Sequence, residues 1–541
     1  MTDKENINEN GEAVENTEES TIFSAPAEPV KPLTKRQRES AAKKQVKTIA
    51  ALVVAAAAAL CLYFFVVVPI VNYVEEIVKD PVELLDGEVL GTNDRILLFE
   101  HFERKDIQSI DVHNRYGEYG FYYNTKDEAF YVKEHEYATF DKELFSSLVV
   151  STGYPLSIER VTTECEDLSE YGLAEEQSPA YYTVTTRPDA DGSTESHTVY
   201  VGDKIPTGGG YYVRYAGRDA VYILDADLGK TVLAPIEDLI TPMLTLPMSQ
   251  NDYFMIKNFI LTDSEEPIVA ITFLEDEEKE ALAMTSAYRM LYPSNYSVNS
   301  TSYSEVLQVL TNFTGIRTVA LAPTEEEIEE YGLAKPAFSI SYNYQGIEQT
   351  VVFSEKNENG NYYAGSLLFN IIAELDGSTM KWLEWDIIDW VDPPIFMMNI
   401  NNVATITLES DTATRTFDLF GDGQELVVTE RATGFKPTVK NFRQFYKTLL
   451  SVNLQDHVTV DITEEAAEAL TVSEKPYLTL TVETRAGQKT EYKFYPYSTR
   501  RAYYTVNGSG EFYVLRDMVT KVISDGEKVM TNTDIDSAAH S

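Results

Sequence analysis

The heptapeptide DLSEYGL occupies residues 167–173, and a related one, EIEEYGL, occupies residues 327–333. Each copy is acidic and ends in Tyr-Gly-Leu, with Gly172 and Gly332 where the C-terminus of a helix favours a left-handed residue. A third acidic stretch, TEEAAEAL at residues 463–470, lacks the Tyr-Gly pair. A short acidic helix that recurs along the chain predicts several copies of one structural unit.

The segments on either side of these stretches also correspond. An amphipathic helix precedes each one, and we expect Asp141, Ser302 or Ser304, and Thr438 to cap these helices. The apolar helix faces are formed by Phe145, Leu148, Val149 and Thr152; by Val306, Leu307, Leu310 and Phe313; and by Phe442, Phe445, Tyr446, Leu449 and Leu450. A proline-led strand follows each acidic stretch, at residues 179–186, 336–344 and 476–484.

Strand segments open each unit and hairpin-spaced strands close it, so strands outnumber helices. Single, dispersed helices among many strands indicate an α+β fold with mainly antiparallel sheets. We therefore predict three repeated α+β units, each with its own core. The predicted bounds are 104–250, 251–393 and 394–530 for the units (the third being degenerate), 72–103 for a connector, and 1–47 and 531–541 for disordered tails.

An apolar run precedes these units, TIAALVVAAAAALCLYFFVVVPIV at residues 48–71. Its 24 uncharged residues span about 36 Å as a helix, more than a hydrocarbon core of about 30 Å. No small-residue cleavage pattern follows, so we expect a single retained transmembrane helix rather than a cleaved signal. Seven basic residues and one acid lie in residues 31–47, which predicts a cytoplasmic N-terminus and an extracytoplasmic C-terminal region. The same basic cluster suits contact with the headgroups of a lipid bilayer.

The chain of 541 residues has a formal net charge of −43, and most of this charge lies beyond the apolar run. Such a surface repels nucleic acid, which we exclude as a partner. Two cysteines are present, Cys61 within the apolar run and Cys165 beyond it, so no disulfide forms within the exported region. That is unusual for a disulfide-stapled secreted protein and fits a bacterial surface better.

The motifs that suggest chemistry each have a simpler interpretation. The glycines in residues 207–210 lie between strands and lack the Lys-Ser/Thr of a phosphate loop, which favours a hairpin loop. The pairs Glu325 with Glu327 and Glu275 with Glu278 favour solvated surface over glycosidase carboxylates. The sequence Asp376-Gly-Ser lacks the acids of an EF-hand. Six histidines are scattered, at positions 101, 113, 135, 197, 457 and 540.

No group of residues combines a nucleophile with its base, and no group has the spacing of metal ligands. We therefore predict no catalytic residue, no cofactor and no metal site. The expectation that follows is a protein without enzymatic activity.

Aromatic residues are the one enrichment that suggests binding, with 35 tyrosines and with Trp382, Trp385 and Trp390 clustered in KWLEWDIIDW. A sugar-stacking platform is one interpretation of the tryptophans. Packing between the second and third units is the other. The tryptophan spacings do not put all three rings on one helical face, and the segment joins two units, so we favour packing.

Several motifs resemble those of DUF4340, a family of uncharacterised bacterial proteins. They are residues 167–173, 201–204 (VGDK), 207–213 (TGGGYYV) and 220–225 (AVYILD) in the first unit, 330–336 and 361–363 in the second, and 501–504 in the third. The family has no established activity, and some of its members resemble companions of ABC-type transporter systems. Repeated units on one anchor, which present a long composite surface, fit such a role.

Together these features imply a membrane-anchored extracytoplasmic scaffold or accessory protein. Its expected partners are the lipid bilayer and a membrane or envelope protein, such as an ABC transporter subunit. A cell-surface carbohydrate-binding protein is the alternative, and a carboxylate-dependent surface hydrolase is a less favoured one.

Overall fold

The computed structural model describes residues 57, 60–68, 82–189, 191–249, 251–252, 255–264, 266–458 and 475–536. The chain divides into two compact parts, Met1–Glu83 and Leu84–Ser541, and all three predicted units lie in the second part. In the first, the described residues include η1 (Tyr63–Val67), whose side chains are exposed. The predicted membrane helix at residues 48–71 falls largely outside the described residues. Within the described ranges, no helix has the length and apolar character needed to cross a membrane.

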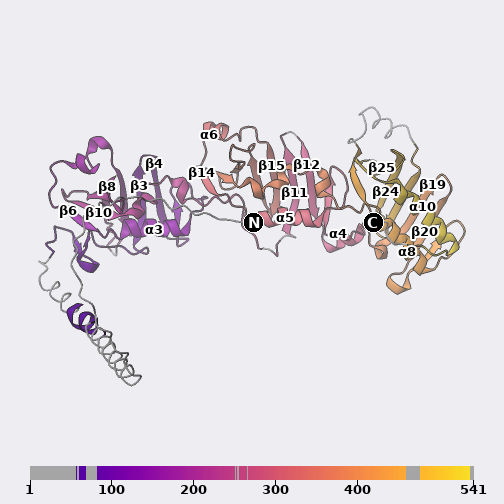
Figure 1. The fold of residues 1–541 in the computed structure, drawn as a ribbon, viewed down its shortest axis with the longest axis horizontal. Coiled ribbons are helices and arrows are strands. Elements are labelled where there is room, and N and C mark those ends of the chain that lie inside the picture. The colour runs from indigo at the N-terminus through magenta and orange to yellow at the C-terminus, as the bar shows by residue number, and fades with distance from the viewer. Residues whose placement is uncertain are drawn as a thin grey trace, which may run out of the picture. The chain divides into compact units, whose positions relative to one another are not determined.

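Three eight-stranded sheets form the described part of Leu84–Ser541, together with a small two-stranded one (Figure 1). The first sheet comprises β3 (Ile107–Asn114), β4 (Gly117–Asn124), β5 (Ala129–Val132), β6 (Glu159–Thr162), β7 (Ala180–Thr186), β8 (Ser196–Lys204), β9 (Gly210–Tyr215) and β10 (Val221–Asp225). The second comprises β11 (Ile256–Asp263), β12 (Pro267–Phe273), β13 (Tyr288–Tyr292), β14 (Arg317–Leu321), β15 (Phe338–Tyr344), β16 (Ile347–Phe353), β17 (Tyr362–Ser366) and β18 (Ile371–Leu375). The third comprises β19 (Val403–Ser410), β20 (Thr414–Phe420), β21 (Val427–Glu430), β22 (Leu454–His457), β23 (Leu478–Thr484), β24 (Lys489–Pro496), β25 (Arg501–Val506) and β26 (Phe512–Leu515).

The three sheets share one strand order. It is β5-β4-β3-β7-β8-β9-β10-β6 in the first, β13-β12-β11-β15-β16-β17-β18-β14 in the second and β21-β20-β19-β23-β24-β25-β26-β22 in the third. All neighbouring strands in these sheets are antiparallel. The predicted α+β fold with repeated, mainly antiparallel sheets is confirmed, whereas the exact residue bounds of the units stay a prediction.

Each sheet is completed by strands from both halves of its unit. A three-stranded meander comes first, a helix then carries the chain across, and a short strand (β6, β14 or β22) takes the far edge. The last four strands fill the space between. Strand β3 therefore pairs with β4 on one side and with β7 on the other.

One amphipathic helix accompanies the first half of each unit: α3 (Lys142–Gly153), α5 (Ser300–Leu310) and α8 (Val439–Leu450). Asp141 caps α3, since its Oδ1 accepts hydrogen bonds from the N–H groups of Glu143 and Leu144 at 2.8 and 2.9 Å. Thr438 caps α8. Both predicted caps are confirmed.

The cap predicted for α5 is wrong. Asn299 caps this helix, and its side chain accepts hydrogen bonds from the N–H groups of Thr301 and Ser302. Ser302 and Ser304 lie inside the helix. An amide oxygen placed before a run of hydroxyl residues captures the free N–H groups of the first turn, so the helix begins earlier than predicted.

The acidic stretches form η3 (Leu168–Tyr171) and α6 (Glu325–Glu330), whereas residues 463–470 lie outside the described residues. Gly172 and Gly332 follow them with φ of 68° and 72°, so the predicted left-handed glycines are confirmed. The other α-helices among the described residues are α4 (Asp276–Ala281), α7 (Ile387–Trp390) and α10 (Arg516–Thr531).

Helix α3 covers one face of the first sheet. Phe145, Leu148 and Val149 pack there in one apolar cluster with strand residues such as Ile110 and Tyr182. The second half of the predicted connector also enters this core through Ile96, Leu98 and Phe99, close to the two-stranded sheet of β1 (Val89–Leu90) and β2 (Ile96–Leu97). Residues 96–99 therefore belong to the first unit rather than to a linker.

A second apolar cluster contains side chains of both the second and the third sheet, for example Phe259 and Phe417. Buried hydrogen bonds also join the first unit to the second. Thr318 Oγ1 donates to the carbonyl of Ile240 at 3.0 Å, and Ser366 Oγ donates to that of Leu244 at 2.7 Å. Packed side chains therefore join the second unit to the third, and buried hydrogen bonds join the first unit to the second.

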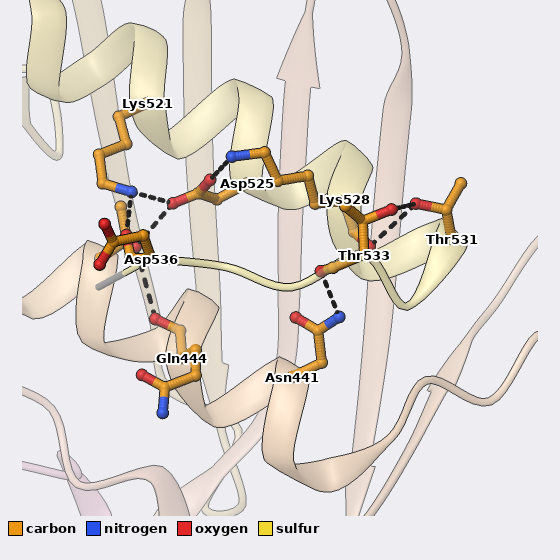
Figure 2. Close-up of polar contacts among 9 residues, drawn as sticks. Asn441, Gln444, Lys521, Asp525, Lys528, Thr531, Thr533 and Asp536 are labelled. Carbon is orange, nitrogen blue, oxygen red and sulfur yellow. Dashed lines mark hydrogen bonds and ion pairs between the residues drawn. The ribbon is translucent and has the colours of Figure 1, made fainter. Parts of the chain in front are cut away.

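Helix α10 extends the third unit beyond its sheet, an element that was not predicted. After it, Asn532 adopts a left-handed conformation, and the chain runs beside α8, where Asn441 Nδ2 donates to the carbonyl of Thr533 at 2.7 Å (Figure 2). Ile535 is buried. Residues 531–536, expected to begin a disordered tail, thus pack on the third unit, while residues 537–541 lie outside the described residues.

Candidate functional site

The clustered tryptophans belong to the apolar core. Trp382 and Trp390 are 2% and 0% exposed, and Trp385 packs on Trp390 with ring centroids 5.2 Å apart. The same cluster holds side chains of the second and third sheets. The interpretation as a sugar platform is therefore wrong for Trp382 and Trp390, because buried rings present no face to a ligand, and Trp385 is half-buried against this core.

The other candidate motifs have local structural roles. Residues 207–210 connect β8 to β9, so the predicted hairpin loop is confirmed. Glu278 accepts a hydrogen bond from Glu275 N–H at 3.0 Å, and Glu327 accepts one from Thr324 N–H at 2.8 Å, so both acids cap helices. Asp376 caps a single helical turn through Ser378 N–H, and hydrogen bonds from the Ser378 side chain and N–H lower the pKa of Asp376.

The histidines lie in separate surroundings. His197 stacks on Phe99 with ring centroids 4.3 Å apart, and burial lowers its pKa. His457 Nε2 lies 3.2 Å from Asp386 Oδ1. In the part of the chain that the structure describes, no three His, Cys, Asp or Glu side chains are grouped so as to hold a metal ion.

The buried carboxylates of the described residues all have hydrogen-bond donors. Glu88 accepts from Tyr222 OH and from Arg160, both at 2.6 Å. Glu374 is held by Asn361 at 3.0 Å and by Arg317 at 2.9 Å, and the Asn361 bond is the main reason why its pKa is lowered. Carboxylates engaged in this way hold elements of the fold together through charge-assisted hydrogen bonds.

A row of side chains crosses the first sheet and is the strongest candidate for a binding site. Glu118 on β4 lies opposite His113 on β3, His113 opposite Tyr181 on β7, Tyr181 opposite Tyr200 on β8, and Tyr200 opposite Arg214 on β9. Directly opposed residues in antiparallel strands project from the same face of a sheet. We call these five residues the aromatic row.

Contacts run along the whole row. His113 Nδ1 lies 3.1 Å from Glu118 Oε1, and the His113 ring stacks on Tyr181 with centroids 4.9 Å apart and planes inclined by 17°. The Tyr181 and Tyr200 centroids lie 5.7 Å apart. The Arg214 guanidinium lies 5.0 Å from the centroid of Tyr200, within the range of a cation–π contact.

The row lies on the face of the sheet turned away from α3. Neighbouring residues on the same strands, such as Val112, Tyr182 and Val213, point to the core and are buried. Tyr181 and Tyr200 are half-buried and outside that core, whereas the Glu118 side chain is 76% exposed. Strand alternation thus leaves the row accessible to solvent.

A cavity of about 330 Å³ opens at the β4 end of the row. Its lining from the first sheet includes Asp111, His113, Glu118, Lys133 and Tyr181, and Ile236 and Leu321 line it as well. Asp111 and Lys133 form an ion pair on this face. The cavity therefore combines aromatic surface with charged hydrogen-bonding groups.

Two further aromatic pairs flank the row. Tyr122 and Tyr131 lie 6.1 Å apart on β4 and β5, and Tyr212 on β9 lies 4.9 Å from Tyr171 at the end of η3. Desolvation raises the pKa of Tyr122, and the neighbouring Glu136 adds to the shift. The phenol groups of both pairs can donate and accept hydrogen bonds.

The sequence analysis missed this site because it depends on register. Side chains alternate between the two faces along a strand, so Tyr181 and Tyr200 project from the face that the buried Tyr182 and Val199 do not use. Only the pairing of β3, β7 and β8, however, brings the three rings together. A search for aromatic residues at the outward positions of successive strands would have found Tyr181 and Tyr200.

A family model described as "Domain of unknown function (DUF4340)" matches residues 154–336 and again residues 289–481. Both matched stretches begin in one sheet and end in the next, so their limits do not coincide with the sheets. The chain matches no curated protein and no solved structure. The two matches together cover more than half of the chain, which therefore belongs to the DUF4340 family.

Proposed function

We propose that this protein is a membrane-anchored extracytoplasmic scaffold that binds a membrane or envelope protein. The observation that carries the proposal is that three eight-stranded sheets of the same strand order lie in one compact part of the chain, Leu84–Ser541. Repeated domains joined by buried contacts present a composite surface, which suits binding more than chemistry.

The junctions between units support this role. Tyr296, before α5, packs on Phe512 of β26 with ring centroids 5.3 Å apart, and the Asn399 N–H donates to the carbonyl of Ala283 at 2.6 Å. Buried ring contacts and hydrogen bonds of this kind oppose bending between the second and third sheets.

Charge and sequence supply the rest of the proposal. The uncharged run at residues 48–71, with its basic flank, serves as the anchor and places the sheets outside the cytoplasm. The net charge of −43 favours steered encounter with a basic partner surface. An ABC transporter subunit is the partner suggested by family resemblance, as an analogy only.

Crosslinking in intact cells followed by mass spectrometry tests the scaffold. We expect the full chain to capture one envelope or transporter protein through surface lysines of its sheets. A chain that captures no protein would contradict the scaffold role. Protease added to protoplasts tests the anchor separately, since we expect loss of the sheets and survival of the N-terminal segment.

Carbohydrate binding is the second candidate function. The specific observation in its favour is the aromatic row, which offers half-buried rings beside charged groups on an uncovered sheet face. This candidate no longer involves Trp382, Trp385 or Trp390.

A further inference from the structure

The second and third sheets show that the fold does not require the aromatic row. Tyr181 immediately precedes the buried Tyr182 on β7, and the matching positions are Ser339 before the buried Ile340 on β15 and Thr479 before the buried Leu480 on β23. Ser339 lies opposite Thr262 and Val352, and Val352 lies opposite Gly365. The second sheet thus has no ring at any of these four positions.

The third sheet also lacks rings at the matching positions. Thr479 lies opposite Glu409 and Lys493, and Lys493 lies opposite Thr505. Cross-strand aromatic pairs stabilise sheets, which is the simplest reason for having them. Because two sheets with the same strand order form without rings here, stability of the sheet does not explain the row.

The chemistry of the row matches one class of ligand. Half-buried rings stack on the apolar faces of sugars, and the charged ends of the row, Glu118 and Arg214, bind hydroxyl groups at the rim. Thr183 and Thr198, opposed on the same strands and 2.8 Å apart, add hydroxyls beside the rings. At a strand spacing of about 4.8 Å, five adjacent strands extend the row over about 19 Å, the length of a short oligosaccharide.

We propose that the aromatic row binds a neutral glycan, with one sugar entering the cavity of about 330 Å³ at its β4 end. This proposal rests on the second candidate function, for which it names the ligand class, and it does not depend on the scaffold role. A polyanionic glycan is disfavoured by the net charge of −43. The local charges are of both signs, with Asp111 paired to Lys133 and with Glu118 and Arg214 at opposite ends of the row, which suits hydroxyls rather than sulfates or carboxylates.

A peptide ligand fits this face less well. An extended peptide adds to the edge of a sheet, where backbone groups are unpaired, whereas the row crosses β3, β7 and β8, which are paired on both sides. A proline-rich peptide prefers an apolar aromatic groove, and this row ends in two charged side chains. A neutral glycan is therefore the occupant that the geometry favours.

The first experiment applies the full chain, purified in detergent, to an array of neutral, sulfated and carboxylated oligosaccharides. We expect binding to neutral members, and the best of them is then titrated by calorimetry. Tyr181→Ser combined with Tyr200→Val copies the second sheet, and we expect about a tenfold rise in Kd from the loss of two stacking rings. Tyr181→Phe keeps the ring and is expected to keep binding.

Tyr363→Ser is the matched control, since Tyr363 on β17 makes a comparable ring contact, 4.8 Å from Tyr331, on a sheet without the row. We expect its Kd to be unchanged. Hydrogen exchange on the unmodified chain gives an independent measurement, and the bound oligosaccharide should slow exchange in β7 and β8. This measurement does not depend on any variant folding.

Three results would overturn the proposal: no binding to any neutral member of the array, equal Kd for the double variant and the unmodified chain, or no slowing of exchange in β7 and β8. If the double variant instead loses a crosslinked protein while no glycan binds, the face is a protein contact and the glycan proposal fails. Loss of crosslinked partner with glycan binding intact would contradict the scaffold alone.

Discussion

Asp525 Oδ2 lies 2.6 Å from Lys521 Nζ, and Asp525 Oδ1 lies 2.8 Å from Lys528 Nζ, although the Asp525 side chain is wholly buried (Figure 2). Thr448 on α8 donates a third hydrogen bond at 2.9 Å. The carboxylate thus joins two lysines of its own helix to the neighbouring helix. Buried charges require such complete satisfaction to be tolerated.

Replacing Asp525 by Ala should loosen the contact between α8 and α10. We expect a loss of about 2 kcal/mol in the free energy of local opening, because three bonds to a charged group disappear while both lysines can reach water. Hydrogen exchange of α10 amides measures this free energy of local opening. Asp411→Ala is the control, since its pair with Lys475 is exposed at both ends and should change stability by less than about 0.5 kcal/mol. Equal effects would contradict the prediction.

The same helix contact should weaken in acid. Burial disfavours the charged form of Asp525, but hydrogen bonds from Lys521, Lys528 and Thr448 outweigh it and lower the pKa below the ordinary value of 3.8. A lowered pKa in the folded state means that the stabilisation is complete above pH 3.8 and is lost as the pH falls further. Exchange rates of α10 amides, measured from pH 5 downwards and corrected for intrinsic rates, should rise only below about pH 3.8. Asp525→Asn should remove the dependence.

Trp382→Ala should destabilise the second unit without affecting glycan binding. Removing a ring that is 2% exposed leaves a cavity and costs about 4 kcal/mol. Denaturant unfolding followed by fluorescence measures the loss. Leu367→Ala, at a side chain 71% exposed, serves as the control with a change below about 0.5 kcal/mol. A stable Trp382→Ala variant that no longer binds sugar would restore the tryptophan platform.

The two left-handed glycines should respond unequally to alanine. Gly332→Ala costs about 1 kcal/mol through its φ of 72°, because a Cβ there meets only Ser354 Cβ at 3.5 Å. Gly172→Ala should cost more, since its Cβ would lie 2.6 Å from Asp203 Cγ and 2.8 Å from Asp203 N. Thermal unfolding of both variants compares them directly. A larger loss of stability in Gly332→Ala than in Gly172→Ala would contradict the contacts assigned to these two glycines.

The features that sequence predicts well are local ones. Asp141 and Thr438 cap their helices through side-chain oxygens that act within three residues, and Gly172 and Gly332 turn the chain where no other residue fits as easily. Repetition of these signals along the chain was enough to predict related units. The cap of α5 was misplaced because residues 299–304 offer several polar side chains that suit the same position.

The features that sequence did not predict depend on distant partners. The edge strand β6 carries no apolar alternation, and its place is set by pairing with β10. Helix α10 was missed although Val519, Val522 and Val529 line its buried side at helical spacing. The aromatic row needs the register of five strands, which single-strand patterns do not contain.

The shared strand order also dictates when each sheet can form. Strand β3 can complete its pairing only after β7 has been made, and Thr162 on β6 can pair only after Val221 on β10 has been made. Neither half of a unit can therefore form the complete sheet by itself. Pairings this far apart carry a large loop-closure entropy and fold slowly. A chain delivered N-terminus first completes its first sheet when β10 emerges, its second when β18 does and its third with β26. Until then β3 keeps an unpaired edge, which in a partly made unit is open to pairing with strands of other chains.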